Sequence, residues 1–137
     1  MSTRRATIQW TETAKRCLER LPLKVRKGLL EKADRLLECD DPREASKALV
    51  GPLSGYYRIV YSRYRAIYSV DEDRLPDGDV LVHIKIRFVA AGIRKEGDKK
   101  DIYKFAMRLI KMFEATAEEQ QEEDDSEEGD PNKKGGA

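Results

Sequence analysis

Residues 56–70 read YYRIVYSRYRAIYSV, and this stretch decides the fold. β-Branched and aromatic residues fill it on both sides of Ser62-Arg63, which predicts two strands joined by a tight turn. The turn lacks the Asn-Gly or Gly-X pair that two-residue hairpins favour, so its own residues do not fix the register. The pattern of apolar residues has to set the register instead.

With Tyr61 opposite Tyr64 as the closing pair, alternation divides the hairpin into two faces. One face is large and suited to packing on helices: Tyr57, Ile59, Tyr61, Tyr64, Ala66 and Tyr68. The other face holds Val60 and Ile67 together with two arginines, Arg58 and Arg65. These two arginines are predicted to be diagonal neighbours on adjacent strands.

A third strand is predicted to begin at Val80, after an acidic turn over residues 71–79. Val80, Val82, Ile84, Ile86 and Phe88 share one face of this strand. The opposite face holds Leu81, His83, Lys85 and Arg87. The sheet is therefore predicted to be apolar toward its helices and basic toward solvent, although a solvated sheet face is normally polar in any case.

Helical patterns lie on both sides of these strands, which predicts an α+β domain. A short strand around residues 6–9 precedes a helical hairpin, with one helix over about 12–20 and a second that starts at Pro22 and ends before Asp40-Asp41-Pro42. A last helix is predicted to start at Asp98, whose carboxylate suits an N-cap. Its apolar stripe is Ile102, Ala106, Leu109, Ile110 and Phe113.

The chain has 137 residues and a net charge of +1, which conceals a strong asymmetry. Residues 118–137 hold nine of the 26 acidic residues and two of the 27 basic ones. The net charge is therefore −7 on residues 118–137 and +8 on residues 1–117. We expect one domain over 1–117 and an acidic, disordered tail over 118–137. The basic domain is suited to polyanions such as nucleic acid or the ribosome.

Several classes of protein are not expected from this composition. No apolar run is long enough for a membrane span, and the N-terminus lacks the apolar stretch of a signal peptide, so we expect a cytoplasmic protein without a membrane partner. The cysteines, Cys17 and Cys39, are isolated and there is one histidine, so neither a disulfide framework nor a metal site is expected. No cofactor is implied.

The order of residues 47–70, KALVGPLSGYYRIVYSRYRAIYSV, then becomes specific when joined to Gly92-Ile93-Arg94 and Asp101-Ile102-Tyr103. From about Trp10 to Ile110 the chain resembles the RelE/ParE toxin superfamily of type II toxin-antitoxin systems. The resemblance implies a small twisted antiparallel sheet with an N-terminal helical hairpin and a C-terminal helix. It also implies neutralisation by a cognate antitoxin protein.

The two branches of this superfamily differ in their target. RelE-like toxins are ribosome-dependent endoribonucleases, or mRNA interferases, that cut messenger RNA without a metal, whereas ParE-like toxins inhibit DNA gyrase. By position in the family pattern, Arg58, Arg65 and Arg94 resemble the phosphate-handling residues, and Tyr103 resembles the aromatic that stacks on or orients the nucleotide. Lys85 and Arg87 on the basic face are candidate RNA contacts.

The resemblance does not identify a general base in this chain. The ribonuclease branch often has a lysine two residues after the first cation of the hairpin, and this chain has Val60 there. Burial among arginines would lower a lysine pKa, which makes Lys95, Lys99 and Lys100 candidate bases. His83 is a further candidate because its unperturbed pKa is near neutrality, although a structural role suits a mid-strand position better.

The sequence thus predicts a toxin that inhibits translation by cleaving messenger RNA on the ribosome. A ParE-like gyrase inhibitor is the alternative favoured by Val60, and an inactive binding module is also compatible because a fold does not fix a function. The acidic tail has two interpretations. It keeps the protein soluble, or it contacts the basic face in cis, since a flexible segment of this length spans roughly 25 Å.

Overall fold

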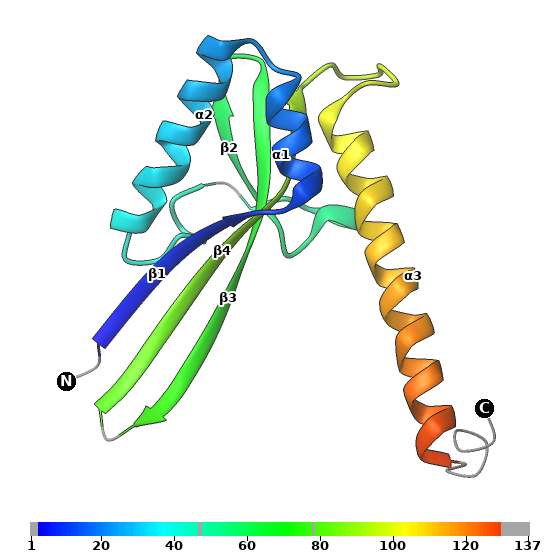
Figure 1. Ribbon diagram of the computed structural model, residues 1–137. Helices are drawn as coiled ribbons and strands as arrows, with labels where there is room; N and C mark the ends of the chain where they lie inside the picture. Colours follow the sequence, from blue (N-terminus) through cyan, green and yellow to red (C-terminus); the bar gives the residue numbers. More distant parts are fainter. Residues whose placement is uncertain (1–2, 47, 78, 130–137) are drawn as a thin grey trace. The chain divides into compact units, whose positions relative to one another are not determined.

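The computed structural model describes residues 3–46, 48–77 and 79–129 of the chain (Figure 1). The elements are β1 (Thr3–Trp10), α1 (Glu12–Glu19), α2 (Leu23–Arg35), β2 (Tyr57–Tyr61), β3 (Tyr64–Asp77), β4 (Asp79–Ile93) and α3 (Ile102–Gly129), with short 3₁₀ turns at Leu36–Glu38 and Gly51–Leu53. The chain forms two compact units, Met1–Ala106 and Met107–Ala137. The sheet and the candidate site lie within the first unit.

The predicted hairpin and its register are confirmed. β2 pairs antiparallel with β3, with Tyr61 opposite Tyr64 and Arg58 opposite Ile67. Ser62 closes the turn with a φ of 53°, a left-handed conformation that a non-glycine residue adopts only when a turn requires it. Arg58 and Arg65 therefore occupy one face of the sheet, on adjacent strands.

The α+β class is confirmed, and the sheet is mixed. The strand order is β1-β4-β3-β2, and the edge strand β1 pairs in parallel with β4 while the other pairs are antiparallel. A bulge between Ile67 and Tyr68 of β3 shifts the register against β4. β1 aligns Ala6, Ile8 and Trp10 with the apolar face of β4, so this edge strand extends the core.

The acidic turn predicted over residues 71–79 is wrong, because β3 continues to Asp77 and β4 already begins at Asp79. Asp71 and Asp73 are strand residues opposite Lys85 and His83. Asp73 pairs with Lys85 at 2.6 Å, and this hydrogen bond lowers the pKa of Asp73 and raises that of Lys85. Opposite charges across the strands thus stabilise a pairing that composition alone did not indicate.

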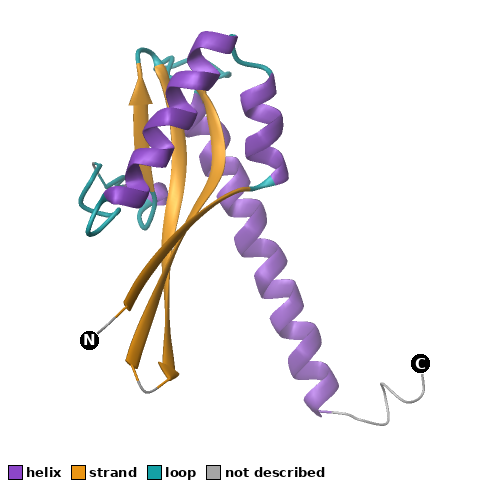
Figure 2. Cartoon of the chain, turned by 60° about the vertical axis from the view of Figure 1, so that its left-hand side comes forward, coloured by secondary structure: helices purple, strands orange, loops and turns teal. Residues whose placement is uncertain are grey.

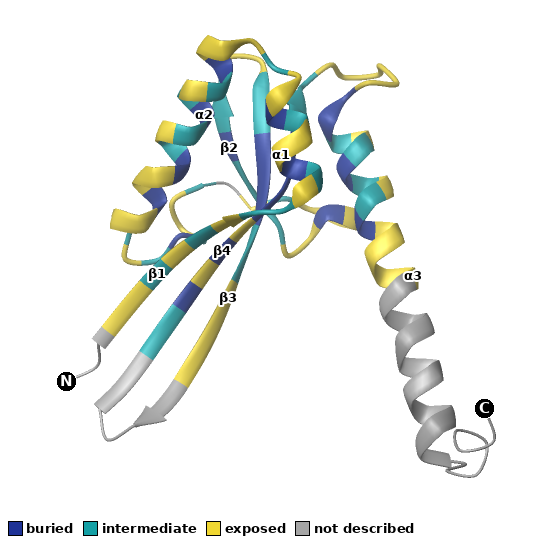
Figure 3. Cartoon of the chain, viewed as in Figure 1, coloured by how far each residue is buried: buried dark blue, intermediate teal, exposed yellow. Residues whose placement is uncertain are grey.

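Helices α1 and α2 cover the tyrosine-rich face of the sheet, as expected (Figure 2). Thr11 caps α1 through its side-chain oxygen, which accepts from the Ala14 N–H at 3.2 Å. Ala14, Leu29 and Phe88 are fully buried in the shared core (Figure 3). Trp10 packs against this core by stacking on Phe88, with the ring centroids 4.1 Å apart.

The last helix starts later than predicted. α3 begins at Ile102, and Asp101 rather than Asp98 precedes its first turn, with the Phe105 N–H donating to the Asp101 carbonyl at 3.1 Å. Asp98 instead accepts from the Lys100 N–H in the turn before it. α3 runs past the predicted boundary at residue 117 to Gly129, and the rest of the predicted tail, 130–137, lies outside the described residues.

Candidate phosphate-binding site

Tyr103 lies between two arginines from different parts of the chain. Arg58, on β2, donates from Nη1 to the Tyr103 hydroxyl oxygen, and its guanidinium carbon is 6.0 Å from the ring centroid. Arg94, just after β4, places its guanidinium carbon 4.4 Å from the same centroid. A guanidinium at this distance is attracted to the aromatic face, so the ring holds both cations close together.

Asp101 fixes the position of Arg94. Its carboxylate accepts from Arg94 Nη1 at 2.6 Å and from the Lys95 N–H at 2.7 Å, and the residue is 1% exposed. Burial by itself raises the pKa of Asp101, but the hydrogen bonds from Arg94 and the Lys95 backbone outweigh burial and leave the pKa lowered. The same hydrogen bond raises the pKa of Arg94, so both groups are ionised at neutral pH.

Arg65 approaches from β3 on the same face. Its Nη1 donates to the carbonyls of Ser62 and Tyr64 at 2.9 and 3.0 Å, so the hairpin turn orients the guanidinium. Its Nε is buried and has no hydrogen-bond partner within the described residues. An unpaired buried donor is costly, and an acceptor such as a phosphate oxygen would satisfy it.

Gly92 lets the start of α3 approach this part of the sheet. It is opposite Arg65 in the register, and a Cβ on Gly92 would lie 3.3 Å from Cδ1 of Ile102. Ile102 is buried there, one residue before Tyr103. The Arg94 N–H also donates to the Arg63 carbonyl at 2.6 Å, which ties the end of β4 to the hairpin turn.

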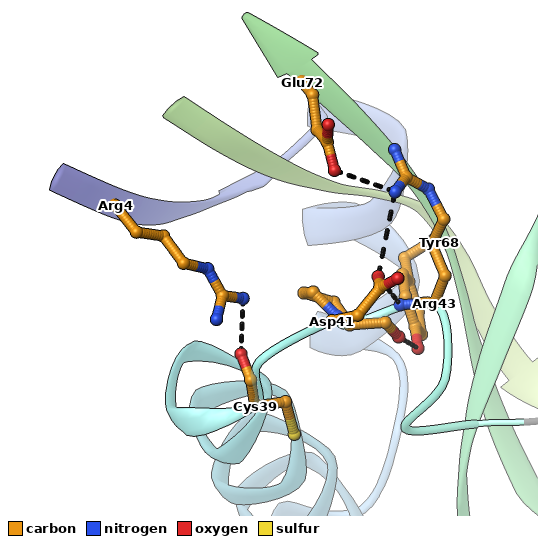
Figure 4. Close-up of polar contacts among 7 residues, drawn as sticks. Arg4, Cys39, Asp41, Arg43, Tyr68 and Glu72 are labelled. Carbon is orange, nitrogen blue, oxygen red and sulfur yellow. Dashed lines mark hydrogen bonds and ion pairs between the residues drawn. The ribbon is translucent and has the colours of Figure 1, made fainter. Parts of the chain in front are cut away.

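A second polar network links the loop before β2 to β3 and to the Arg58 backbone, and Figure 4 draws its Asp41, Arg43, Tyr68 and Glu72. The buried Tyr68 hydroxyl donates to the Pro42 carbonyl at 2.8 Å and contacts Ser46 Oγ at 2.9 Å, and Ser46 Oγ accepts from the Arg58 N–H. Burial raises the pKa of Tyr68 although the Ser46 hydrogen bond opposes it. Arg43 joins the same loop to β3 through Glu72 at 2.9 Å.

The four residues predicted to handle phosphate and nucleotide therefore occupy one end of the sheet, and the other candidates do not join them. Lys95, Lys99 and Lys100 are exposed, so the burial that the general-base hypothesis required is missing at all three. His83 hydrogen-bonds Thr7 at 3.0 Å and lies nine residues along β4 from Gly92, which is roughly 30 Å at the rise of a strand.

Lys85 and Arg87 are exposed on the sheet face where they were predicted, farther along β4 than the arginine cluster. With Thr7, Gln9 and Asp71 they line a shallow hollow of about 470 Å³. Asp71 and the Lys85–Asp73 pair make this face less basic than the pattern of β4 alone indicated.

Two residues of the site were missed from the sequence. Asp101 was named only as part of the family motif and Asp98 was predicted as the N-cap, although an aspartate directly before the first helical residue is a typical N-cap. Lys32 reaches from α2 to the Val60 carbonyl at 2.5 Å, across 28 residues of sequence, and no local pattern indicates such a contact.

Comparison with solved structures places these observations in context. A chain of the toxin-antitoxin complex RelBE2 from Mycobacterium tuberculosis is 28% identical, covering 58% of this chain and 93% of that chain, with a TM-score of 0.42. A chain of the intact E. coli RelBE toxin-antitoxin complex is 25% identical, covering 65% and 96%, with a TM-score of 0.44. The isolated E. coli RelE toxin is 27% identical, covering 75% and 96%, with a TM-score of 0.45.

The fold is similar to that of RelE toxins. No protein-family model and no curated protein matches the sequence. Among the residues that the structure describes, no helix is long and apolar enough to cross a membrane.

Proposed function

We propose that this protein is a toxin that inhibits translation by cutting messenger RNA on the ribosome. The observation that carries the proposal is the contact of both Arg58 and Arg94 with Tyr103, with the partly unpaired Arg65 on the same sheet face as Arg58. Cations grouped around an aromatic ring suit a nucleotide, because the ring stacks on a base while the guanidinium groups hold phosphate.

The charge balance of the cluster fits a phosphodiester that gains negative charge during reaction. Arg94 pairs with Asp101 and also lies near Glu96, whereas neither Arg58 nor Arg65 forms an ion pair with a carboxylate among the residues that the structure describes, so the guanidinium charges of Arg58 and Arg65 are not neutralised by a paired carboxylate there. When the 2′-oxygen of RNA attacks phosphorus and the 5′-oxygen leaves, negative charge develops on the phosphoryl oxygens. Fixed cations near those oxygens lower the barrier, and one such donor contributes about 10²- to 10³-fold in rate.

Each residue has a distinct role in this proposal. Arg65 holds the scissile phosphate through its guanidinium, which the Ser62 and Tyr64 carbonyls orient on the same face as Arg58. Arg58 and Arg94 stabilise the developing charge, and Tyr103 orients the neighbouring base. Asp101 is a positioning residue, because it contacts Arg94 and the helix start rather than the nucleotide site.

The partners follow from the same proposal. The ribosome and messenger RNA supply the substrate, and Lys85 and Arg87 contact the RNA backbone farther along the sheet. An antitoxin protein is the neutralising partner; the similar RelBE and RelBE2 chains belong to toxin-antitoxin complexes, which supports this part of the proposal. The acidic residues from 118 onward compete with RNA for the basic face in cis.

The test is the mapping of 5′ ends on a messenger RNA translated by purified ribosomes, with and without the protein. New 5′-hydroxyl ends that require ribosomes are expected, since attack by the 2′-oxygen releases the 5′-oxygen of the next nucleotide. A full-length message after prolonged incubation with folded protein would contradict the proposal.

A second candidate, inhibition of DNA gyrase, is favoured by one specific observation. Val60 occupies the position at which the ribonuclease branch often has lysine, Lys95, Lys99 and Lys100 are exposed, and His83 hydrogen-bonds Thr7 farther along β4. A supercoiling assay with purified gyrase distinguishes the two functions. Loss of gyrase supercoiling activity in the presence of the protein, without new RNA 5′ ends, would establish gyrase inhibition as the function.

A further inference from the structure

A groove of about 400 Å³ opens beside the arginine cluster, between the C-terminal half of α2, the loop before β2 and β2 itself. Three of its lining residues are cations from separate elements, Lys32 and Arg35 on α2 and Arg58 on β2. No acidic residue is among the described residues that line it. The groove is thus a site of concentrated positive charge at the edge of the sheet.

Lys32 is held in place but keeps most of its hydrogen-bonding capacity. It is half-buried, and its ammonium donates to the Val60 carbonyl at 2.5 Å. An ammonium group has three donors, so two remain for a ligand. The backbone contact fixes the charge over the groove without neutralising it.

Arg35 lies one turn along the same helix face. It pairs with Glu31 at 3.0 Å, but both side chains are about two-thirds exposed, at 67% and 68%. Such exposed pairs contribute little and exchange easily, so Arg35 is free to turn toward an anion in the groove.

Arg58 joins the groove to the cluster, because it lines the groove and also donates to Tyr103. A chain of regularly spaced phosphates that places one phosphate in the cluster would extend past Arg58 to Lys32. The groove and the cluster are therefore two parts of one continuous cationic path.

The edge of β2 is closed to a peptide that would add as another strand. Tyr57 already pairs with Ala48, the Arg58 N–H donates to Ser46 Oγ, and the Val60 carbonyl accepts from Lys32. Strand addition requires free backbone groups along the edge. The groove is positively charged and the adjacent edge of β2 has few free backbone groups. These two properties favour a polyanion that binds through its phosphates over a peptide strand.

We propose that this groove, with Lys32 and Arg35, binds a phosphodiester of single-stranded RNA adjacent to the one held by the arginine cluster. The inference deepens the proposed function and rests on it for the identity of the strand. It assigns to α2 a part in RNA binding and makes Lys32 a binding residue rather than only a support for β2.

The experiment measures binding rather than cleavage. A fluorescent 12-nucleotide RNA with 2′-O-methyl groups cannot be cut by its own 2′-oxygen, and its affinity is measured by anisotropy over a range of KCl concentrations. The test variant is Lys32→Gln, which removes the positive charge and keeps an N–H donor on a slightly shorter side chain. The matched control is Lys27→Gln, which removes one exposed positive charge from the same helix outside the groove.

Lys32→Gln is expected to weaken binding several-fold and to reduce the slope of log K against log salt by about 0.7, the value for one phosphate contact with a single strand. Lys27→Gln is expected to leave both the RNA affinity and the slope of log K against log salt near the wild-type values. Equal effects of the two variants, or no RNA binding by wild type, would overturn the inference. If Lys32→Gln melts early, Arg35→Gln replaces it, since Arg35 makes no side-chain contact with β2 among the contacts described.

The RNA-binding experiment can succeed or fail independently of the proposed messenger RNA cleavage. Wild type that fails to cut messenger RNA while Lys32→Gln still shows the reduced slope supports the groove and refutes the nuclease. Wild type that cuts messenger RNA while Lys32→Gln binds as Lys27→Gln does supports the nuclease and refutes the groove.

Discussion

Replacement of Asp101 is predicted to destabilise the protein in two separable steps. Its carboxylate precedes the first turn of α3 and also binds Arg94 and the Lys95 N–H. Asn is as good an N-cap as Asp, so Asp101→Asn keeps an oxygen that can cap the helix. It removes the negative charge and also replaces one of the two oxygens that accept from Arg94 and the Lys95 N–H with an NH₂ donor. Asp101→Ala removes both the capping oxygen and the charge.

The magnitudes follow from the two contributions. An N-cap contributes about 1 kcal/mol, and hydrogen bonds to a charged group contribute about 1.5–3 kcal/mol. Asp101→Ala is therefore expected to lose about 3 kcal/mol, and Asp101→Asn about half of that. For a domain of this size, 3 kcal/mol corresponds to a fall in Tm of roughly 10 °C.

The pH dependence tests the ion pair itself. Because the pKa of Asp101 is lowered in the folded state, its stabilisation is complete above the ordinary value of about 3.9 and is lost as pH falls through the folded pKa. The difference in unfolding free energy between wild type and Asp101→Asn should therefore shrink below about pH 4. Urea denaturation at pH 7 and pH 3 measures this, with Asp98→Asn as the exposed control. A constant difference, or equal losses for the two asparagine variants, would refute the reasoning.

Two further predictions concern the core. Gly28→Ala should destabilise the fold despite the higher helix propensity of alanine, because its Cβ would lie 2.3 Å from Tyr61 Cε2, and overpacking costs about 1–3 kcal/mol; a raised Tm in differential scanning calorimetry would show the reasoning to be wrong. Tyr68→Phe should cost about 1–2 kcal/mol at neutral pH, since it leaves the Pro42 carbonyl without its donor. Because burial raises the pKa of Tyr68, wild type should also lose stability above about pH 10 while Tyr68→Phe loses less, and parallel alkaline unfolding curves would contradict this.

Local pattern was sufficient for the hairpin and its faces. A two-residue turn at Ser62-Arg63 gave the register that places Tyr57 opposite Tyr68, and alternation along the strands then put Arg58 and Arg65 on one face, as observed. The positions of Arg94 and Tyr103 came from the family resemblance, since their meeting depends on how α3 starts above Gly92.

Other features depended on contacts that a sequence pattern does not record. The direction of β1 is decided by its partner β4, some 80 residues later in the register. The acidic segment after Val70 continues as a strand because its backbone pairs with β4, a partner that the acidic composition did not indicate. Lys32 enters the site from a helix that was predicted only as a cover for the core.

The most direct test of the central claim is the single-turnover rate of messenger RNA cleavage on programmed ribosomes for Arg65→Ala against Arg63→Ala. Both variants remove one arginine at the same hairpin turn, but only Arg65 directs its side chain into the turn and has an unpaired buried Nε, whereas Arg63 is exposed. The account predicts a loss of about 10²-fold or more for Arg65→Ala and a rate near wild type for Arg63→Ala. Equal rates for the two folded variants would contradict it.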